Sequence, residues 1–136
     1  MAGYSPRKLV DKLGIKSGFR LAQIAPPGVA VPVLDELPEN VSIVPLEAGN
    51  IDFILLFATH RSTLEQQFPN AVGAIKVDGM VWVAWPKMSN SAKLSTDLNG
   101  NTVREIGLER GLVDVKVCAI DDTWSGHKFV RRTKDR

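Results

Sequence analysis

The segment Ile51–Phe57 constrains the fold more than any other stretch of this chain. Six of its seven residues are apolar, the exception being Asp52. A strand with apolar side chains on both faces has to be covered on both faces, which is typical of a parallel sheet packed between helices. The segment Met80–Trp85 is apolar throughout and is stopped by Pro86. We therefore predict an α/β fold built around these two buried strands.

Helical and extended segments alternate along the rest of the sequence. Helix starts are marked by Ser or Asn at capping positions, and helix ends by glycine. The predicted helices run from Ser5 to Gly14, over Val29–Leu37, from the capping box Ser62–Glu65 to Ile75 with a division at Pro69, and from Asn99 to Gly111. The predicted strands are Phe19–Ile24, Val41–Val44, Ile51–Phe57, Met80–Trp85, Val115–Ile120 and Lys128–Arg132, with a polar loop over Lys87–Asn99.

Strands that alternate with helices are joined by crossover connections, which give a mostly parallel sheet. Only the last two strands, joined by the turn-rich segment Asp121–Gly126, are close enough to pair antiparallel. The 136 residues are predicted as a single α/β domain, 1–136. Within it, 1–18 holds the N-terminal helix and a linker, and 128–136 holds the last strand and a basic tail.

Charge and cysteine content limit the partners that we expect. Residues 128–136 carry a net charge of +4 and the remaining residues a net charge of −2. The tail is predicted to be a solvated terminus or, alternatively, a docking segment for an acidic partner. The negative body disfavours nucleic acid as a partner. The lone Cys118 is predicted as a small buried hydrophobe in a reducing, cytoplasmic setting. No apolar run reaches the roughly 18 residues of a membrane span, and no signal pattern is present.

Four connecting segments are predicted to meet at one rim of the sheet, namely 26–28, 59–61, 85–87 and 121–125. In an open α/β sheet, ligands bind beyond the carboxyl ends of the strands, at the point where the strand order reverses. Arg61 lies at a helix N-terminus, which favours an anion, and Lys87 could add a second positive charge. The candidate ligand-binding residues are Pro27, Gly28, Thr59, His60, Arg61, Trp85, Lys87, Asp121, Thr123 and Trp124.

Each candidate also has a structural interpretation. Trp85 and Trp124 can pack under loops, and Asp121 can cap its own turn. His60, Arg61 and Lys87 can be solvated surface residues. No nucleophile elbow, phosphate loop or zinc-ligand set is present, so neither catalytic residues nor metal ligands are assigned.

The element order resembles the Rossmann-like fold of class I S-adenosylmethionine (SAM) methyltransferases. The resemblance lies in the strand Phe19–Ile24, the strand that opens on Asp52, and the segment Val77–Val83, which is similar to the family's glycine turn and fifth strand. It implies an open sheet of six strands in the order 2-1-3-4-6-5, with the last strand antiparallel and helices on both faces. It also implies that one helix and one strand are dropped after Val44.

Two cofactor-binding features of that family differ in this sequence. The family's loop after the first strand is rich in glycine, which lets the backbone approach the cofactor. Here the loop is Ile24–Gly28, with two prolines. The family places an acidic residue at the end of the second strand for the ribose hydroxyls, and the nearest counterpart is Glu47, which follows Pro45. The cofactor is left unassigned.

A second resemblance spans nearly the whole chain. The segments Leu13–Gly18, Trp82–Lys87 and Leu112–Gly126 are similar to those of a family of small bacterial proteins of unknown function. This resemblance implies a fold and no activity.

The sequence leaves several functions open. We favour a non-catalytic binding or interaction domain on a degenerate methyltransferase-like scaffold, because the strand order is kept while the cofactor loop is replaced. The alternative is a small enzyme or a nucleotide- or SAM-binding protein that holds an anionic ligand with Arg61 and Lys87. Nucleic-acid binding through the tail is the third hypothesis. An uncovered sheet edge also leaves a homodimer open.

Overall fold

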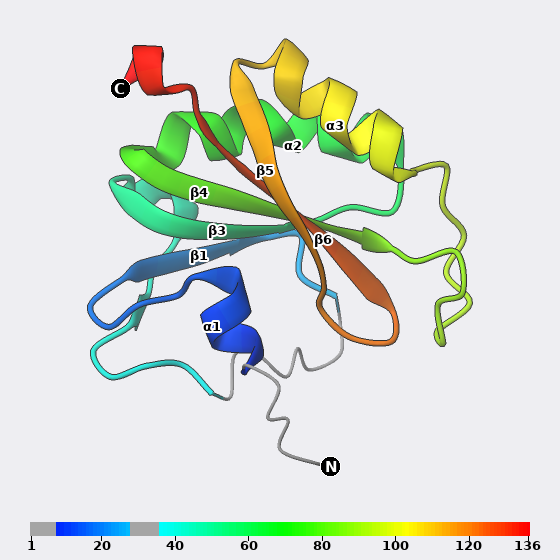
Figure 1. Cartoon of the computed structure of the whole chain (residues 1–136), viewed down its shortest axis with the longest axis horizontal. Coiled ribbons are helices and arrows are strands. Elements are labelled where there is room, and N and C mark those ends of the chain that lie inside the picture. The colour runs from blue at the N-terminus through cyan, green and yellow to red at the C-terminus, as the bar shows by residue number, and fades with distance from the viewer. Residues whose placement is uncertain (1–7, 28–35) are drawn as a thin grey trace.

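A sheet with helices on both faces forms the body of the protein (Figure 1). The structure is a computed structural model that describes residues 8–27 and 36–136. Helix α1 (Leu9–Leu13) packs on one face of the sheet. Helices α2 (Arg61–Ala74) and α3 (Gly100–Glu109) pack on the other. The predicted α/β class is confirmed.

The sheet contains six strands in the order β2-β1-β3-β4-β6-β5, which confirms the predicted order. The strands β1 to β4 are parallel to one another, whereas β6 is antiparallel to both of its neighbours, β4 and β5. Two short 3₁₀ turns, η2 and η3, complete the described elements. The bounds are β1 (Arg20–Ile24), β2 (Ser42–Ile43), η2 (Leu46–Ala48), β3 (Ile51–Phe57), β4 (Ile75–Pro86), β5 (Leu112–Ala119), β6 (Trp124–Arg131) and η3 (Thr133–Asp135).

The side chains of β3 alternate between two hydrophobic cores. Ile54 and Leu56 pack toward α2 and α3. Phe53, Leu55 and Phe57 pack toward α1. All five are buried, none more than 2% exposed. The strand is apolar along its length because neither of its faces meets water.

Helix α1 is tied to the sheet by a buried hydrogen bond. The indole nitrogen Nε1 of Trp82 donates to the carbonyl oxygen of Leu13 over 2.9 Å. Gly14 follows with φ +83° and ends the helix, as predicted from its position. The predicted cap residues Ser5 and Pro6 lie outside the described residues.

Asp52 connects the amino ends of three neighbouring parallel strands. Its Oδ2 accepts a hydrogen bond from the backbone N–H of Arg20 in β1 over 2.8 Å. Its Oδ1 forms an ion pair with Lys76 Nζ in β4 over 3.1 Å. Both contacts lie at the rim opposite the carboxyl ends of the strands.

Two predictions about α2 were wrong. Pro69 does not divide the helix, which runs unbroken from Arg61 to Ala74. Proline removes one backbone N–H and leaves the carbonyl four residues earlier unpaired. Pro69 lies on the exposed surface, where water can satisfy that carbonyl. Ser62 is not the N-cap either, because the cap residue is His60 and the first N–H group binds a carboxylate from the loop before α3.

Three strand starts were also predicted too late, and that of β5 lies at Leu112 rather than Val115. Strand β4 begins at Ile75, and its pairing with β3 jumps from Ile51–Ile75 to Phe53–Met80, so the residues between them form an irregularity. Strand β6 begins at Trp124 rather than Lys128, because the turn from β5 is shorter than the polar sequence indicated.

Cys118 was predicted to be buried and is only partly buried. It belongs to β5, which is the edge strand of the sheet. Of the predicted helix Val29–Leu37, only the last two positions lie within the described residues.

We predict that Gly107→Ala destabilises the protein. Gly107 of α3 lies directly against the ring of Phe129, and a Cβ atom there would overlap that ring. Phe129 is fully buried and packs edge-to-face on Phe68 with ring centroids 5.4 Å apart, so it has little room to move. The free energy of unfolding should fall by about 1–3 kcal/mol.

Gly73→Ala on α2 is the matched control. No heavy atom lies within 4 Å of a Cβ atom placed there, so alanine should raise the free energy of unfolding by about 0.5–1 kcal/mol. Urea unfolding measures both effects. Equal changes in the two variants would contradict the close packing of α3 on β6.

Candidate functional site

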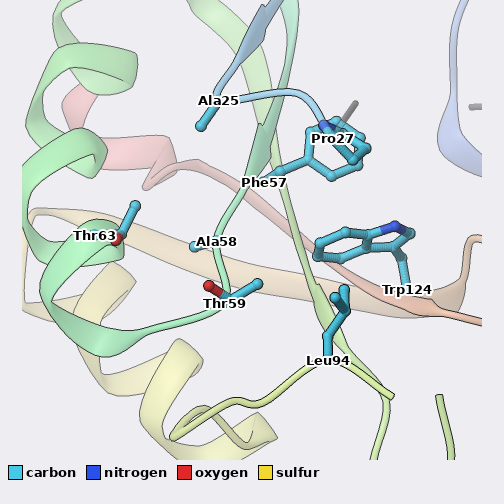
Figure 2. A pocket seen from close by; sticks show the side chains of 8 residues that line it. All are labelled: Ala25, Pro27, Phe57, Ala58, Thr59, Thr63, Leu94 and Trp124. Carbon is cyan, nitrogen blue, oxygen red and sulfur yellow. The ribbon is translucent and has the colours of Figure 1, made fainter. Parts of the chain in front are cut away.

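A cavity of about 330 Å³ lies at the carboxyl ends of β1 and β3 (Figure 2). The strand order reverses here, since β1 is followed by β2 on one side and has β3 on the other. This is the place where open α/β sheets bind ligands. The cavity is lined by Ala25, Pro27, Phe57, Ala58, Thr59, Thr63, Leu94 and Trp124.

The wall of the cavity is mostly apolar. Figure 2 shows Phe57, Pro27, Trp124 and Leu94 along one side and the two threonines on the other. The rings of Phe57 and Trp124 meet edge-to-face, with centroids 5.1 Å apart and an interplanar angle of 80°. Both residues are at most 5% exposed, so the surrounding core fixes this aromatic pair.

A tight turn holds Trp124 in place. Oδ1 of Asp121 accepts hydrogen bonds from the backbone N–H groups of Thr123 and Trp124, each over 2.8 Å. The N–H of Ile120 donates to the carbonyl oxygen of Trp124, and the N–H of Lys87 donates to that of Thr123, both over 2.9 Å. The carboxylate of Asp121 is therefore used to build the turn.

Asn90 positions Leu94 at the cavity. Its side chain is 7% exposed. Its Oδ1 accepts from the N–H of Leu94 over 2.6 Å, and its Nδ2 donates to the carbonyl oxygen of Lys87 over 2.8 Å. The sequence predicted a polar loop here and missed both residues. The available signal was an asparagine four residues before an isolated leucine in a polar stretch.

The chain leaves β1 through a residue in the left-handed region. Ala25 lines the cavity and has φ +53°. This conformation costs an L-residue other than glycine about 1–2 kcal/mol. The loop after β1 therefore has a backbone conformation that favours glycine, although its residues are an alanine followed by two prolines.

The N-terminus of α2 borders the cavity through Thr63, but its positive end is already neutralised. The backbone N–H of Arg61 donates to Oδ1 of Asp97 over 2.7 Å. A carboxylate at this position offsets the partial positive charge of the helix end. Among the described residues that line the cavity, no side chain is charged.

Three of the predicted site residues line this cavity, namely Pro27, Thr59 and Trp124. Gly28 lies outside the described residues. His60 is exposed, and its Nδ1 lies 2.9 Å from Oγ1 of Thr59. Arg61 is also exposed and pairs with Glu65 over 3.2 Å along the helix.

The remaining predicted residues lie near the same rim without lining the cavity. Trp85 packs on the core beneath α2 and α3. Lys87 binds Thr123 through its backbone. Oγ1 of Thr123 lies 3.0 Å from Oγ of Ser91. An anion held between Arg61 and Lys87 stays a prediction.

Glu47 lies at a different place. It lines a second cavity, of about 290 Å³, beside the C-terminal end of α2. Glu47 belongs to η2, which leads from β2 to the start of β3. Its carboxylate therefore lies toward the amino end of β3 and not at the carboxyl end of β2.

Several solved structures that are similar to this chain are methyltransferases. A SAM-dependent methyltransferase from Aquifex aeolicus is similar to 89% of this chain over 86% of its own length, with 13% identity and a TM-score of 0.64. A ribosomal protein L11 methylase from Lactobacillus delbrueckii subsp. bulgaricus covers 91% of this chain over 75% of its own, with 12% identity and a TM-score of 0.60. Magnesium protoporphyrin IX methyltransferase from Synechocystis PCC 6803 with bound SAM matches 91% of this chain over 74% of its own length, with 9% identity and a TM-score of 0.58.

The chain has the fold of SAM-dependent methyltransferases. No protein-family profile and no curated protein matches it. The resemblance to a family of small bacterial proteins therefore stays a prediction.

The described residues around the cavity do not fit SAM. That cofactor has a charged amino-acid end, a sulfonium and a ribose diol, and burying such groups needs charged or hydrogen-bonding partners. The nearby carboxylates of Asp97 and Asp121 already bind backbone N–H groups, and Glu47 lines the other cavity. The cavity offers two threonine hydroxyls and apolar surface.

Across residues 8–27 and 36–136, no cluster of His, Cys, Asp and Glu could hold a metal ion. No helix there is both long enough and apolar enough to cross a membrane.

We predict that Asp121→Ala loosens the wall of the cavity. The variant loses both hydrogen bonds to the turn, which should lower the free energy of unfolding by about 1–2 kcal/mol and change the fluorescence of Trp124. Asp122→Ala is the matched control, because Asp122 is the exposed neighbour in the same turn. Urea unfolding followed by tryptophan emission measures both. A loss of stability as large in Asp122→Ala would contradict the assigned role.

Proposed function

We propose that this protein is a non-catalytic binding domain on a methyltransferase-like scaffold, and that its cavity takes a small, neutral, aromatic molecule. The observation that supports this is the cavity itself, which lies at the reversal of strand order and has an aromatic pair and no charged side chain among its described lining residues. A volume of about 330 Å³ lies at the lower end of the range for ligand pockets.

Aromatic ligands suit this wall for two reasons. The Phe57–Trp124 pair and Pro27 offer flat apolar surface, and ring contacts with an aromatic ligand add to the free energy of apolar burial. The hydroxyl groups of Thr59 and Thr63 lie opposite and can orient one polar substituent.

A SAM- or nucleotide-binding protein is the second candidate. It is supported by the likeness in fold to solved structures, one of which contains bound SAM. The absence of charged partners among the described lining residues weighs against it.

Isothermal titration calorimetry distinguishes these candidates. The panel contains indole and adenine as neutral aromatic probes, and SAM and S-adenosylhomocysteine as charged ones. We expect at least one neutral probe to bind with a dissociation constant near or below about 1 mM, equivalent to about −4 kcal/mol, and SAM to bind more weakly. Micromolar SAM binding would instead favour the second candidate.

The variant Thr63→Phe tests whether the ligand occupies this cavity. Phenylalanine at position 63 fills space at its wall, so the affinity for the neutral probe should fall at least tenfold. Gln66→Phe is the matched control, because Gln66 is exposed on the next turn of α2 and does not line the cavity. Equal affinities in the two variants would place the ligand elsewhere.

A further inference from the structure

Two buried polar atoms lie near the first turn of α3, away from the cavity described above. They are Nδ1 of His127 in β6 and Nε1 of Trp85 in β4, and neither has a hydrogen-bond partner among the described residues. His127 is only 5% exposed. Buried polar atoms in native structures are nearly always paired, so two such atoms together call for a binding partner.

Both rings face Gly100, the first residue of α3. A Cβ atom placed on Gly100 would lie 3.8 Å from Cε1 of His127 and 4.0 Å from Cζ2 of Trp85. The gap between them therefore accepts a methyl group carried on Gly100, in van der Waals contact with both rings. Nδ1 is bonded directly to Cε1, and Nε1 is two bonds from Cζ2, so both unpaired nitrogens lie close to this gap. Trp85 and Gly100 are partly exposed, whereas Nδ1 and Nε1 themselves are buried, so a ligand reaches the two nitrogens only when a side chain moves.

The helix end supplies further donors. The first N–H groups of an α-helix have no partner within the helix. Asn99 satisfies one of them, because its side-chain Oδ1 accepts from the N–H of Thr102 over 2.9 Å. The N–H of Val103 makes the first bond within the helix, to the carbonyl oxygen of Asn99 over 3.0 Å. The N–H groups of Gly100 and Asn101 precede these in the first turn, where the helix dipole favours negative charge.

An acidic residue faces the far side of the His127 ring. Nε2 lies 3.8 Å from Oδ2 of Asp114 in β5, and Oδ1 of Asp114 pairs with Nε of Arg104 in α3 over 3.1 Å. A carboxylate on this side favours a proton on Nε2, which leaves Nδ1 free to accept or to take up a second proton. Burial lowers the pKa of His127 from its ordinary value of 6.5, Asp114 opposes this shift, and Arg104 adds to it. The free ring is therefore neutral at pH 7.

We propose that a small oxyanion binds beneath the first turn of α3, with one oxygen in the gap between Gly100, His127 and Trp85, and that His127 takes up a proton as the oxyanion binds. The indole N–H, the helix N–H groups and the imidazolium then all donate to negative oxygen, which is the stronger class of hydrogen bond. The positive ring is flanked by Asp114 on one side and the oxyanion on the other. This site is independent of the aromatic-ligand cavity, and neither proposal depends on the other.

Proton uptake makes binding depend on pH in a defined direction. Oxyanion binding and protonation of His127 favour each other by the same factor. Affinity should fall as the pH rises from the pKa of His127 in the free protein to its pKa in the complex, by about tenfold in total for a pKa shift of about one unit, and should level off on either side. A site without proton uptake would show no such slope.

NMR titration of the ¹⁵N-labelled protein tests the proposal. The probes are sodium sulfate and sodium acetate at constant ionic strength, with sodium chloride as the reference salt. Sulfate and chloride do not titrate in the range in which histidine does. We expect sulfate or acetate to raise the pKa of His127 by about one unit, a tenfold gain in proton affinity, and to shift the Trp85 Nε1–H resonance. A response to acetate alone would identify a carboxylate as the ligand group.

His60 is the internal control, since it is exposed and lies outside this site. An equal shift of the two histidines, or an equal response to chloride, would show general salt screening and overturn the proposal. No shift of either His127 or the Trp85 indole would overturn it as well.

Two variants locate the ligand. Gly100→Ala fills the gap with a methyl group and should abolish the sulfate-induced shifts of His127 and Trp85. The matched control Asn101→Ala alters an exposed neighbour and should retain both shifts. Trp85→Phe removes the indole donor and should weaken sulfate binding about tenfold. The pKa of His127 in the anion-free Gly100→Ala protein verifies that the ring remains buried. An unchanged sulfate response in Gly100→Ala would contradict the location.

Discussion

Burial of β3 on both faces is the constraint on which the remainder of the molecule depends. Alternate side chains of this strand enter two separate cores, so helices have to cover the sheet from two directions. Crossover connections then bring the carboxyl ends of β1, β3 and β4 to one rim. The opposite rim is held by Asp52, which contacts both β1 and β4. Because these contacts hold the strand register at the opposite rim, the sequence of the loops at the carboxyl rim can differ without changing that register.

The sequence was sufficient to predict the class of fold, because apolar patterning indicated buried strands that alternate with helices. The strand order was predicted from the resemblance to the methyltransferase family. It was less informative where the tertiary environment decided the outcome. The solvent position of Pro69 keeps α2 continuous, and the edge position of β5 exposes Cys118 in part. Neither property can be read from the nearest neighbours in the sequence. The start of β6 was missed because polar residues of a turn and of a strand start look alike.

The candidate site was predicted only in part for a related reason. Its position followed from topology, and Pro27, Thr59 and Trp124 do line the cavity. Its chemistry did not follow, because the sequence indicated charged groups at this rim, whereas the wall is mostly apolar and includes Phe57 and Leu94. The charged residues of this rim mainly build structure, as Asp97 does for α2 and Asp121 for its turn. Such roles depend on backbone geometry, which composition does not reveal.

The two edges of the sheet differ in their capacity to recruit another strand. Strand β2 contributes only two residues, too few to template a neighbour. Strand β5 is eight residues long, but its pairing with β6 shifts between Asp114 and Lys116, which places Val115 in an irregularity. Such a bulge interrupts the even row of free N–H and C=O groups that an added chain would need. The exposed Val115 and Val117 therefore lie on an edge that is poorly shaped for the addition of another strand.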